Sequence, residues 1–351
     1  MIRSIRLQNF RSYSDASFEF EPSVNIVVGP NASGKTNLLE AVMVLSRGRS
    51  YKASDAELIK HRKAWARLDG VFEGSERSVK LEPIGDSVDK TFSINATNLK
   101  RLNYERSIPI VFFEPNQTAI IAGSPSDRRD WADDILERTN PQFKSLSAAY
   151  RRTLTQRNAL LKRGERFAGR QLFAWDVRLG DLGAQLATVR TDLATQINTS
   201  LARTYNKIAG RRSKLSLRYD AEFPINHYAS RLVAKLGKSL QSDLARGFTG
   251  HGPHREDFIF SLNTYPAGIT ASRGETRSLI LALKKIEAEL VEKSRGQAPI
   301  LLLDDVFSEL DGKRRQALVE LLTGRQAILT TTDADAVIEY FDRGHKLIAL
   351  K

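Results

Sequence analysis

The sequence predicts an α/β fold that is interrupted by an inserted lobe of helices. Short apolar runs that read as buried strands occur toward both ends of the chain, at residues 24–28, 300–303 and 327–330. Between them, from Leu172 to Ile208, apolar residues are separated only by threes and fours, the spacing of one face of an amphipathic helix. We therefore expect one α/β domain, made from both ends of the chain, with a helical insertion.

The predicted insertion covers residues 111–244 and leaves residues 1–110 and 245–351 to the α/β domain. Apolar spacing predicts a first helix over residues 143–161 and a single longer helix over residues 172–208, about 55 Å long at 1.5 Å per residue. A short glycine-containing turn separates them. The two helices should therefore run antiparallel and form an arm.

The positive charge of the chain is concentrated in this insertion. Lys and Arg number 54 and Asp and Glu number 41, a net charge of +13. Residues 141–240 hold 19 basic and 6 acidic side chains, whereas the remainder holds 35 of each. Such an excess favours an anionic partner, and we expect nucleic acid, bound through its phosphates in a sequence-independent and salt-sensitive way.

The candidate DNA contacts are basic residues that flank the apolar stripes of the arm. They are Arg151, Arg152, Arg157, Lys162, Arg163, Arg211, Arg212 and Lys214. The alternative is a merely solvated helical face, but such a face usually mixes both signs of charge.

The absence of cysteine excludes disulfides, thiolate metal sites and cysteine nucleophiles. It also favours a reducing compartment. The longest apolar runs are too short to span a membrane, and the N-terminus lacks the apolar stretch of a secretion signal. We therefore expect a cytoplasmic protein.

A phosphate-binding loop is predicted directly after the first buried strand. Residues 29–36 read Gly-Pro-Asn-Ala-Ser-Gly-Lys-Thr and fit G-x-x-x-x-G-K-[ST] between a strand and a helix. In this pattern backbone N–H groups surround the phosphates of ATP, Lys35 reaches the β- and γ-phosphates, and Thr36 ligates Mg²⁺. The residues expected to bind ATP are Gly29, Asn31, Ala32, Ser33, Gly34, Lys35, Thr36 and Asn37.

A second apolar strand ends in two carboxylates, Asp304 and Asp305. In combination with the phosphate loop, the first is expected to bind Mg²⁺ through water. The second is expected to orient or deprotonate the attacking water, so that Asp305 and Lys35 are the candidate catalytic residues.

Residues 272–275 read Ser-Arg-Gly-Glu and precede a helix. A capping box formed by Ser272 and Glu275 is one interpretation of this turn. The order of turn, helix and acidic strand resembles that of ABC-type ATPases, in which the turn contacts the γ-phosphate held by a second subunit. That resemblance implies that Ser272 and Gly274 bind nucleotide.

Four further residues are assigned by the same resemblance to ABC-type ATPases. Asp311 falls in the loop near the dimer seam. Thr332 and Asp333 are the candidates for the γ-phosphate sensor, where ABC enzymes usually carry His. Gln117 lies in the stretch where ABC proteins place a metal-contacting glutamine.

The chain resembles the bacterial RecF family of recombination-repair ATPases, relatives of SMC and Rad50 proteins, over nearly its full length. The segments that carry the resemblance are residues 7–13, the phosphate loop with residues 37–41, and residues 48–50, 123–129, 252–257, 272–275, 301–311 and 330–333. The family usually has Gly-Gln where this chain has Ala32-Ser33, and often Gln where it has Arg273 and Glu275.

The resemblance implies an ATP-dependent head-to-head homodimer that binds DNA, prefers gapped or junction DNA, and hydrolyses ATP slowly with DNA stimulation. It further implies cooperation with RecO and RecR in loading RecA, and a contact of Arg11 with nucleotide phosphate. Two other functions are open: an ATP-gated scaffold for protein partners, and the ATPase subunit of a phage-defence system.

The pair of histidines at 251 and 254 has two interpretations. It could be half of a metal site, but the sequence offers no Cys and no further paired His. A loop at the junction of the two lobes is the alternative.

Overall fold

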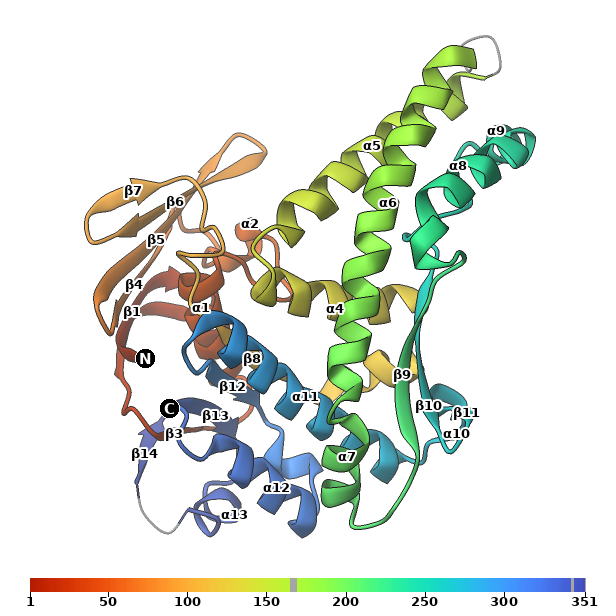
Figure 1. Cartoon of the computed structure of the whole chain (residues 1–351). Helices are drawn as coiled ribbons and strands as arrows, with labels where there is room; N and C mark the ends of the chain where they lie inside the picture. The colour runs from red at the N-terminus through yellow and green to blue at the C-terminus, as the bar shows by residue number, and fades with distance from the viewer. Residues whose placement is uncertain (165–168, 342–343, 351) are drawn as a thin grey trace. The chain divides into compact units, whose positions relative to one another are not determined.

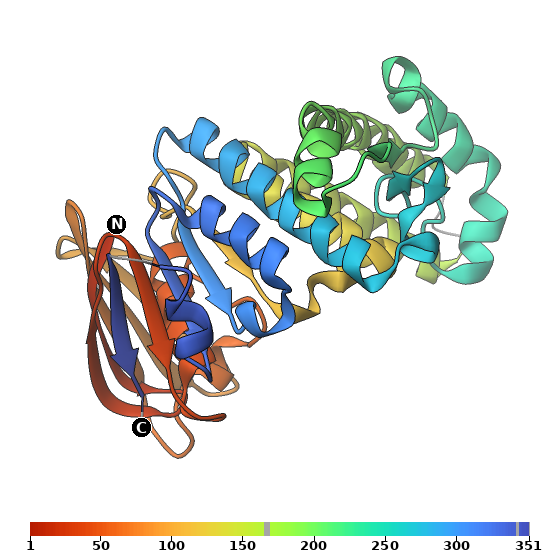
Figure 2. The same cartoon turned by 90° about the horizontal axis from the view of Figure 1, so that it is seen from below.

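The computed structural model describes residues 1–164, 169–341 and 344–350 (Figure 1). The chain forms two compact units. Unit 1 comprises Met1–Gln117 and Lys284–Lys351, and unit 2 comprises Thr118–Leu283. Both chain termini belong to unit 1 (Figure 2).

Unit 1 contains an antiparallel sheet with the strand order β2-β1-β4-β5-β6-β7. In most of these strands, buried and more accessible residues alternate, as expected for a sheet with one face on the core. The bounds are β1 (Ile2–Phe10), β2 (Tyr13–Glu19), β4 (Ala66–Phe72), β5 (Ser75–Ile84), β6 (Ser87–Ile94) and β7 (Thr97–Leu99).

A second sheet of unit 1 is parallel throughout, with the order β14-β3-β13-β12-β8. Its central strands are buried along most of their length because both faces of the sheet are covered. The bounds are β3 (Val24–Val28), β8 (Ile110–Phe113), β12 (Ile300–Asp304), β13 (Ala327–Thr331) and β14 (His345–Ala349).

The helix α1 (Lys35–Arg47) contacts strands of both sheets, and one apolar core joins all three. Leu38, Leu39 and Val42 of this helix are fully buried. Burial of each such side chain stabilises the fold by roughly 1.5–3 kcal/mol. The phosphate loop is thereby held on a rigid base. The other helices of unit 1 are α2 (Asp55–Leu58), α12 (Gly312–Leu322) and α13 (Asp335–Ile338).

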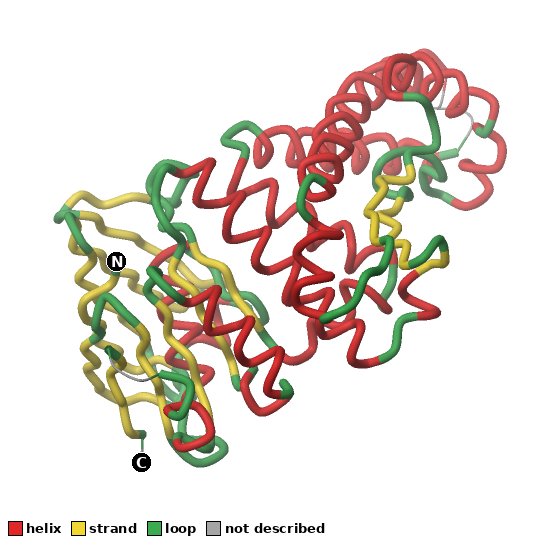
Figure 3. The backbone as a smooth tube through the Cα atoms, turned by 60° about the horizontal axis from the view of Figure 1, so that its bottom comes forward, coloured by secondary structure: helices red, strands yellow, loops and turns green. Residues whose placement is uncertain are grey.

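Unit 2 is mainly helical and carries a three-stranded sheet of order β11-β10-β9 (Figure 3). The helices α5 and α6 lie side by side and form the predicted arm. The bounds are α3 (Ala119–Ala122), α4 (Pro125–Thr139), α5 (Phe143–Arg163), α6 (Gly169–Asn198), α7 (Leu201–Ala209), β9 (Leu215–Asp220), α8 (Tyr228–Lys238), α9 (Leu240–Arg246), β10 (Asp257–Leu262), β11 (Tyr265–Pro266) and α10 (Ala267–Thr270). The helix α11 (Arg273–Arg295) begins in unit 2 and ends in unit 1.

The prediction of a single helix over residues 172–208 is wrong, because α6 ends at Asn198 and α7 begins at Leu201. The Asn198 side chain donates to the carbonyl of Leu217 at 2.6 Å and accepts from its N–H at 2.8 Å. Asn, Thr and Ser readily make such bonds in place of helical ones. The break is not visible in the apolar spacing, because α7 continues the same spacing after it.

The division of the chain also differs from the predicted boundaries of 1–110, 111–244 and 245–351. Unit 2 continues to Leu283 because β10 pairs with β9 along its whole length, from Asp257 opposite Asp220 to Leu262 opposite Leu215. The sequence prediction assigns this strand to the α/β domain only because strand-like and helical patterns alternate along residues 245–351.

No helix in the described part of the chain combines the length and the apolar character needed to cross a bilayer.

Candidate nucleotide-binding site and basic arm

The phosphate loop lies between β3 and α1, as its sequence predicts. Gly34 has φ 101° and precedes the first residue of α1. A Cβ at this position would lie 2.9 Å from the hydroxyl oxygens of both Ser12 and Tyr13, so glycine is required by conformation and by space. Ala32 also adopts a left-handed conformation, with φ 67°, at a cost of about 1 kcal/mol.

Lys35 is buried and folded back onto its own loop. Its Nζ donates to the carbonyl oxygens of Gly29 at 2.7 Å and Pro30 at 2.8 Å. These are weak partners for an ammonium group compared with phosphate oxygens. The side chain therefore sits where an incoming phosphate can replace two carbonyl groups.

The phosphate loop and the acidic strand meet through one contact. The Thr36 hydroxyl, at the start of α1, lies 2.9 Å and 3.0 Å from the two carboxylate oxygens of Asp304, at the end of β12. Thr330, on the neighbouring strand β13, donates to Asp304 Oδ1 at 2.8 Å. Two hydroxyls and a carboxylate are hard oxygen ligands of the kind that Mg²⁺ prefers, so these residues fit the ion.

Asp305 has a strained backbone and a carboxyl group without a full set of partners. Its φ is 48°, and its N–H donates to the Thr330 hydroxyl at 3.0 Å. Its Oδ1 is buried and has no hydrogen-bond partner among the described residues. Burial, assisted by the nearby Asp304 charge, raises the pKa of Asp305 above its ordinary value. An under-satisfied carboxyl with a raised pKa is suited to taking up a proton.

The segment after β8 adds polar groups to the same unit. Burial is the main cause that raises the pKa of Glu114, with the charge of Asp304 acting in the same direction. Gln117 donates from Nε2 to the carbonyl of Phe112 at 3.0 Å, and its Oε1 is buried without a partner among the described residues.

Arg11 belongs to the turn that packs on the phosphate loop, but all its nitrogens donate to protein groups. It forms a two-point ion pair with the fully buried Glu40 at 2.7 Å and 3.0 Å and bonds to the carbonyl of Glu57 at 3.0 Å. The pair raises the pKa of Arg11. A contact of Arg11 with nucleotide therefore stays a prediction, and Glu40 is a partner that sequence reasoning missed.

The assignment of the γ-phosphate sensor to Thr332 or Asp333 stays a prediction. Thr330 is the residue that contacts the acidic pair, whereas Thr332 and Asp333 are exposed. Thr330 lies inside a buried strand, and its role follows from the register that sets it opposite Asp304. That register is not visible in the sequence. Asp311 caps α12 by accepting from the N–H of Arg314 at 3.1 Å.

The turn that opens α11 contains the capping box, which was the alternative to a nucleotide contact. Ser272 N–H donates to Glu275 at 2.7 Å, and Glu275 N–H donates to the Ser272 hydroxyl at 3.3 Å. Ser272 is exposed. Glu275 is also ion-paired with Arg211. A cap does not prevent a contact of Ser272 and Gly274 with a second copy of the chain.

Seven of the eight candidate DNA contacts are exposed in unit 2. They are Arg151, Arg152, Lys162, Arg163, Arg211, Arg212 and Lys214. By sequence count, unit 2 holds 26 basic and 15 acidic side chains, a net of +11.

The prediction of Arg157 as a DNA contact is wrong, because this side chain is fully buried. It donates to Asp176 at 2.6 Å, to Asp243 at 2.8 Å and to the Thr249 hydroxyl at 2.9 Å. A buried guanidinium requires such partners. The sequence carried a signal, since Arg157 fills the gap of seven between Leu154 and Leu161 in the apolar stripe of α5.

The two histidines contact different partners. His251 Nδ1 lies 2.9 Å from Glu222, whereas His254 lies 2.8 Å from the Tyr150 hydroxyl and 3.1 Å from the carbonyl of Thr249. Their loop connects α9 to β10 inside unit 2. This loop therefore does not lie at the junction of the two predicted lobes.

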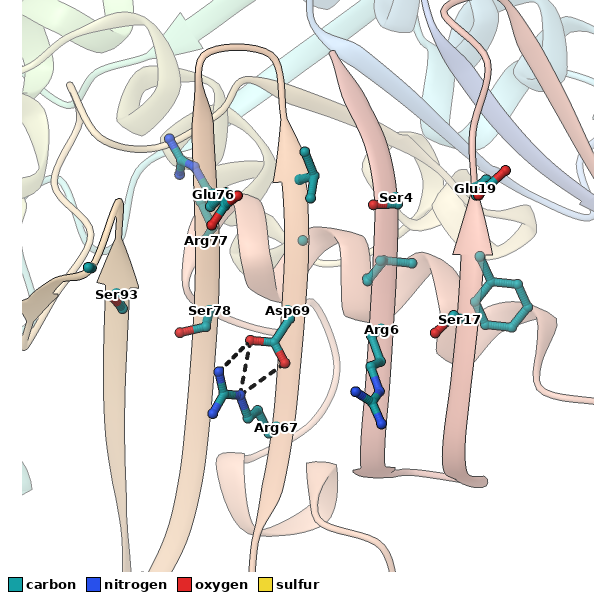
Figure 4. Close-up of a pocket in the computed structure, with 15 residues that line it drawn as sticks. Ser4, Arg6, Ser17, Glu19, Arg67, Asp69, Glu76, Arg77, Ser78 and Ser93 are labelled. Atoms are coloured by element: carbon teal, nitrogen blue, oxygen red, sulfur yellow. Dashed lines mark hydrogen bonds and ion pairs between the residues drawn. The ribbon is translucent and has the colours of Figure 1, made fainter.

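A hollow of about 530 Å³ lies on the outer face of the antiparallel sheet (Figure 4). Two of its arginines are ion-paired: Arg67 contacts Asp69 in the lining at 2.9 Å, and Arg6 contacts Asp15, which lies outside the lining, at 2.7 Å. None of the lining residues belongs to the phosphate loop or to the acidic strand. The hollow is thus separate from the candidate nucleotide site.

Comparison with known proteins confirms the resemblance. The model of the RecF/RecN/SMC N-terminal domain matches residues 1–347. The DNA replication and repair protein RecF of Heliobacterium modesticaldum is 35% identical over 347 residues, which are 95% of this chain and 93% of that one. The chain belongs to the RecF family. RecF of Streptococcus thermophilus is 33% identical over 340 residues, 95% of this chain and 93% of its own.

Solved structures agree with this assignment. The recombination mediator protein RecF with ATP, of the RecFOR pathway, is 32% identical, has a TM-score of 0.86 and is matched over 95% of this chain and 92% of its own. An SMC head bound to the C-terminal winged-helix domain of ScpA has a TM-score of 0.55 at 18% identity and shares the fold. A RecF family member with this fold is an ABC/SMC-type ATPase of DNA replication and repair.

Proposed function

We propose that this RecF family chain binds ATP with Mg²⁺, closes into a head-to-head homodimer, and in that state binds DNA through the basic surface of unit 2. The observation that carries the proposal is the contact of Thr36 with Asp304 at 2.9 Å, which joins the phosphate loop to the acidic strand. The RecF structure that holds ATP supports the choice of nucleotide.

Each residue of the candidate site has a separate task. Lys35 exchanges its bonds to Gly29 and Pro30 for bonds to the β- and γ-phosphates. Thr36 and Asp304 hold Mg²⁺, which when bound neutralises charge on the phosphate oxygens. Asp305 orients the attacking water and takes its proton. Its raised pKa suits that role and its incomplete hydrogen bonding leaves an oxygen for the water.

Closure of the dimer uses the turn at the start of α11. Ser272 and Gly274 contact the γ-phosphate held by the second copy, and Asp311 lies near the seam. Hydrolysis is slow and DNA-stimulated, and it reopens the dimer. The exposure of Ser272 supports a contact outside its own chain. This assignment follows from the family to which the chain belongs.

DNA binds in the cytoplasm through the seven exposed candidate contacts of unit 2, which are Arg151, Arg152, Lys162, Arg163, Arg211, Arg212 and Lys214. The net charge of +11 on this unit supports backbone phosphates as the target. Gapped or junction DNA is the preferred form, and RecO, RecR and RecA are the partners in loading. The pathway named for the RecF structure supports this placement.

Light scattering at saturating ATP tests the dimer directly. The Asp305→Asn variant is used to block turnover, and Lys35→Ala is the matched variant that lacks the phosphate ligand. The Asp305→Asn protein is expected to double its mass with ATP, and Lys35→Ala is expected to stay monomeric. A monomer in both cases contradicts the proposal.

A further inference from the structure

Two of the segments that carry the family resemblance meet inside unit 2. Arg128 forms a two-point ion pair with Asp257, at 2.7 Å and 2.6 Å, and Arg129 donates to the carbonyl of Glu256 at 2.7 Å. Beside them lies a cavity of about 310 Å³, lined by side chains of α4, α5, α6 and the loop before β10. Nothing in the proposed ATP chemistry uses it.

One arginine of the cavity is already neutralised. Arg190 is buried and donates to the two carboxylate oxygens of Asp133 at 3.0 Å and 2.9 Å. It also donates to the carbonyl of Pro253 at 2.7 Å. Because both charges of this pair are satisfied, Arg190 and Asp133 form a fixed and nearly neutral wall.

Two further arginines of the cavity have no ion pair among the described residues. Arg129 uses one nitrogen for the Glu256 carbonyl, and Arg151 is exposed on α5. Burial, with the nearby Arg190, lowers the pKa of Arg129. A cation that burial disfavours and that no carboxylate pairs is one that an incoming anion stabilises.

A serine adds a hydroxyl to the cavity. Ser147 is 7% exposed and lines the cavity, and its side chain makes no hydrogen bond with the described residues, so the hydroxyl can donate to a ligand there. His254 contributes no charge, because burial lowers its pKa to about 4 and its ring nitrogens face the Tyr150 hydroxyl and the Thr249 carbonyl.

We propose that this cavity binds a backbone phosphate of DNA, with Arg129 and Arg151 supplying charge and Ser147 a hydrogen bond. The inference rests on the proposed DNA-binding function and names a contact, Arg129, outside the basic stretches of the arm. DNA is favoured over a free phosphate because Arg151 is continuous with the exposed Arg152 on α5. The exposed carboxylate of Asp130, also in the lining, opposes the phosphate and sets its affinity.

The test compares the double variant Arg129→Gln/Arg151→Gln with the wild type in the full chain. Fluorescence anisotropy with labelled duplex and gapped DNA, with ATP and across a salt series, gives affinity and salt dependence. We expect a loss of at least about tenfold in affinity, since hydrogen bonds to charged groups are strong. The slope of log K against log salt should become less steep by about one per arginine.

Three variants make the result specific. Arg178→Gln removes an exposed charge of α6 outside the cavity. It should leave the slope of log K against log salt nearly unchanged. Asp130→Asn should tighten DNA binding. Arg129→Lys/Arg151→Lys keeps both charges and should keep most of the slope, which also shows that the site tolerates substitution.

Each outcome is decisive. Wild-type DNA binding with an unchanged double variant overturns the cavity proposal, as does an equal loss in Arg178→Gln. Absence of DNA binding by the wild type contradicts the proposed function instead. Calorimetry with inorganic phosphate separates the two sources of phosphate: a double variant that loses phosphate binding but keeps its DNA affinity overturns DNA as the ligand.

Discussion

Arg211 and Glu275 form an ion pair within unit 2, and Glu275 is at the same time the residue that closes the capping box of Ser272. The Glu275 carboxylate thus contacts both Arg211, a candidate DNA contact, and Ser272, which is proposed to contact the nucleotide bound by the partner subunit. Arg211 cannot give the same nitrogen to Glu275 and to a DNA phosphate.

The Glu275→Gln variant tests the consequence of that pair. Gln keeps an oxygen for the Ser272 N–H but loses the charge that holds Arg211. We expect DNA affinity to rise a few-fold, because an exposed pair of this kind is worth only about 0–1 kcal/mol. Anisotropy with labelled DNA measures it. The same variant in an Arg211→Gln background should show no gain; a gain there would mean that Arg211 is not the reason.

Arg157 is fully buried whereas Arg152 is exposed, so substitutions of the two arginines should have different effects on stability. Arg157→Gln leaves the buried carboxylate of Asp176 without its ion-pair partner and Asp243 with Arg246 alone, and it should lower the free energy of unfolding by about 3 kcal/mol or more. Arg152→Gln should change it by less than about 0.5 kcal/mol while weakening DNA binding. Urea denaturation measures the first effect. Equal stabilities of the two variants would contradict the placement of Arg157.

Thr330 is expected to matter where Thr332 does not. Thr330→Val removes the donor to Asp304 and the acceptor for the Asp305 N–H, so we expect a stability loss of about 1–3 kcal/mol and a weaker response of the ATPase to Mg²⁺. Thr332→Val is the matched control, because Thr332 is exposed. A titration of ATPase rate with Mg²⁺ decides between them. A larger effect of Thr332→Val than of Thr330→Val would contradict this expectation.

The raised pKa of Asp305 predicts how hydrolysis depends on pH. A carboxyl whose folded pKa lies above its ordinary value binds its proton more tightly, so the basic form is lost at a higher pH than usual as the solution is acidified. The hydrolysis rate should therefore fall with falling pH before ordinary carboxylates titrate. Asp305→Asn should lose about 10²–10⁴-fold in rate at all pH values.

The same shift has a consequence for stability with a defined sign. Because the folded pKa is raised, ionisation of Asp305 disfavours the folded state, and this cost grows as pH rises from the unfolded pKa to the folded one. Asp305→Asn removes the cost. Thermal unfolding at pH 7 should show the variant at least as stable as the wild type, and a clear loss of stability would contradict the burial of an ionised carboxyl.

The sequence was sufficient for those features that local spacing determines. The phosphate loop lies between an apolar strand and a helix, and Asp304 and Asp305 follow an apolar run, so the local sequence predicts both. The arm followed from one apolar stripe. Features that depend on partners distant in the chain were missed: β10 belongs to unit 2 through its pairing with β9, and Asn198 ends α6 through a bond to Leu217.

Charge alone also misled at one position. Arg157 looks like its exposed neighbours in composition, and only its place in the apolar stripe distinguishes it. Thr330 was passed over for the opposite reason, since it lies inside a strand and contacts Asp304 only through the sheet register. In both cases the role of the side chain depends on the residue that it contacts, and a single sequence does not show that residue.

In the proposed function, ATP controls DNA binding. Its most direct test is the DNA affinity of the wild type and of Lys35→Ala, each measured with and without ATP at a fixed salt concentration. ATP is expected to raise the affinity of the wild type by at least about tenfold and to leave that of Lys35→Ala unchanged, because dimer closure needs the nucleotide. An affinity that is the same with and without ATP in the wild type would contradict it.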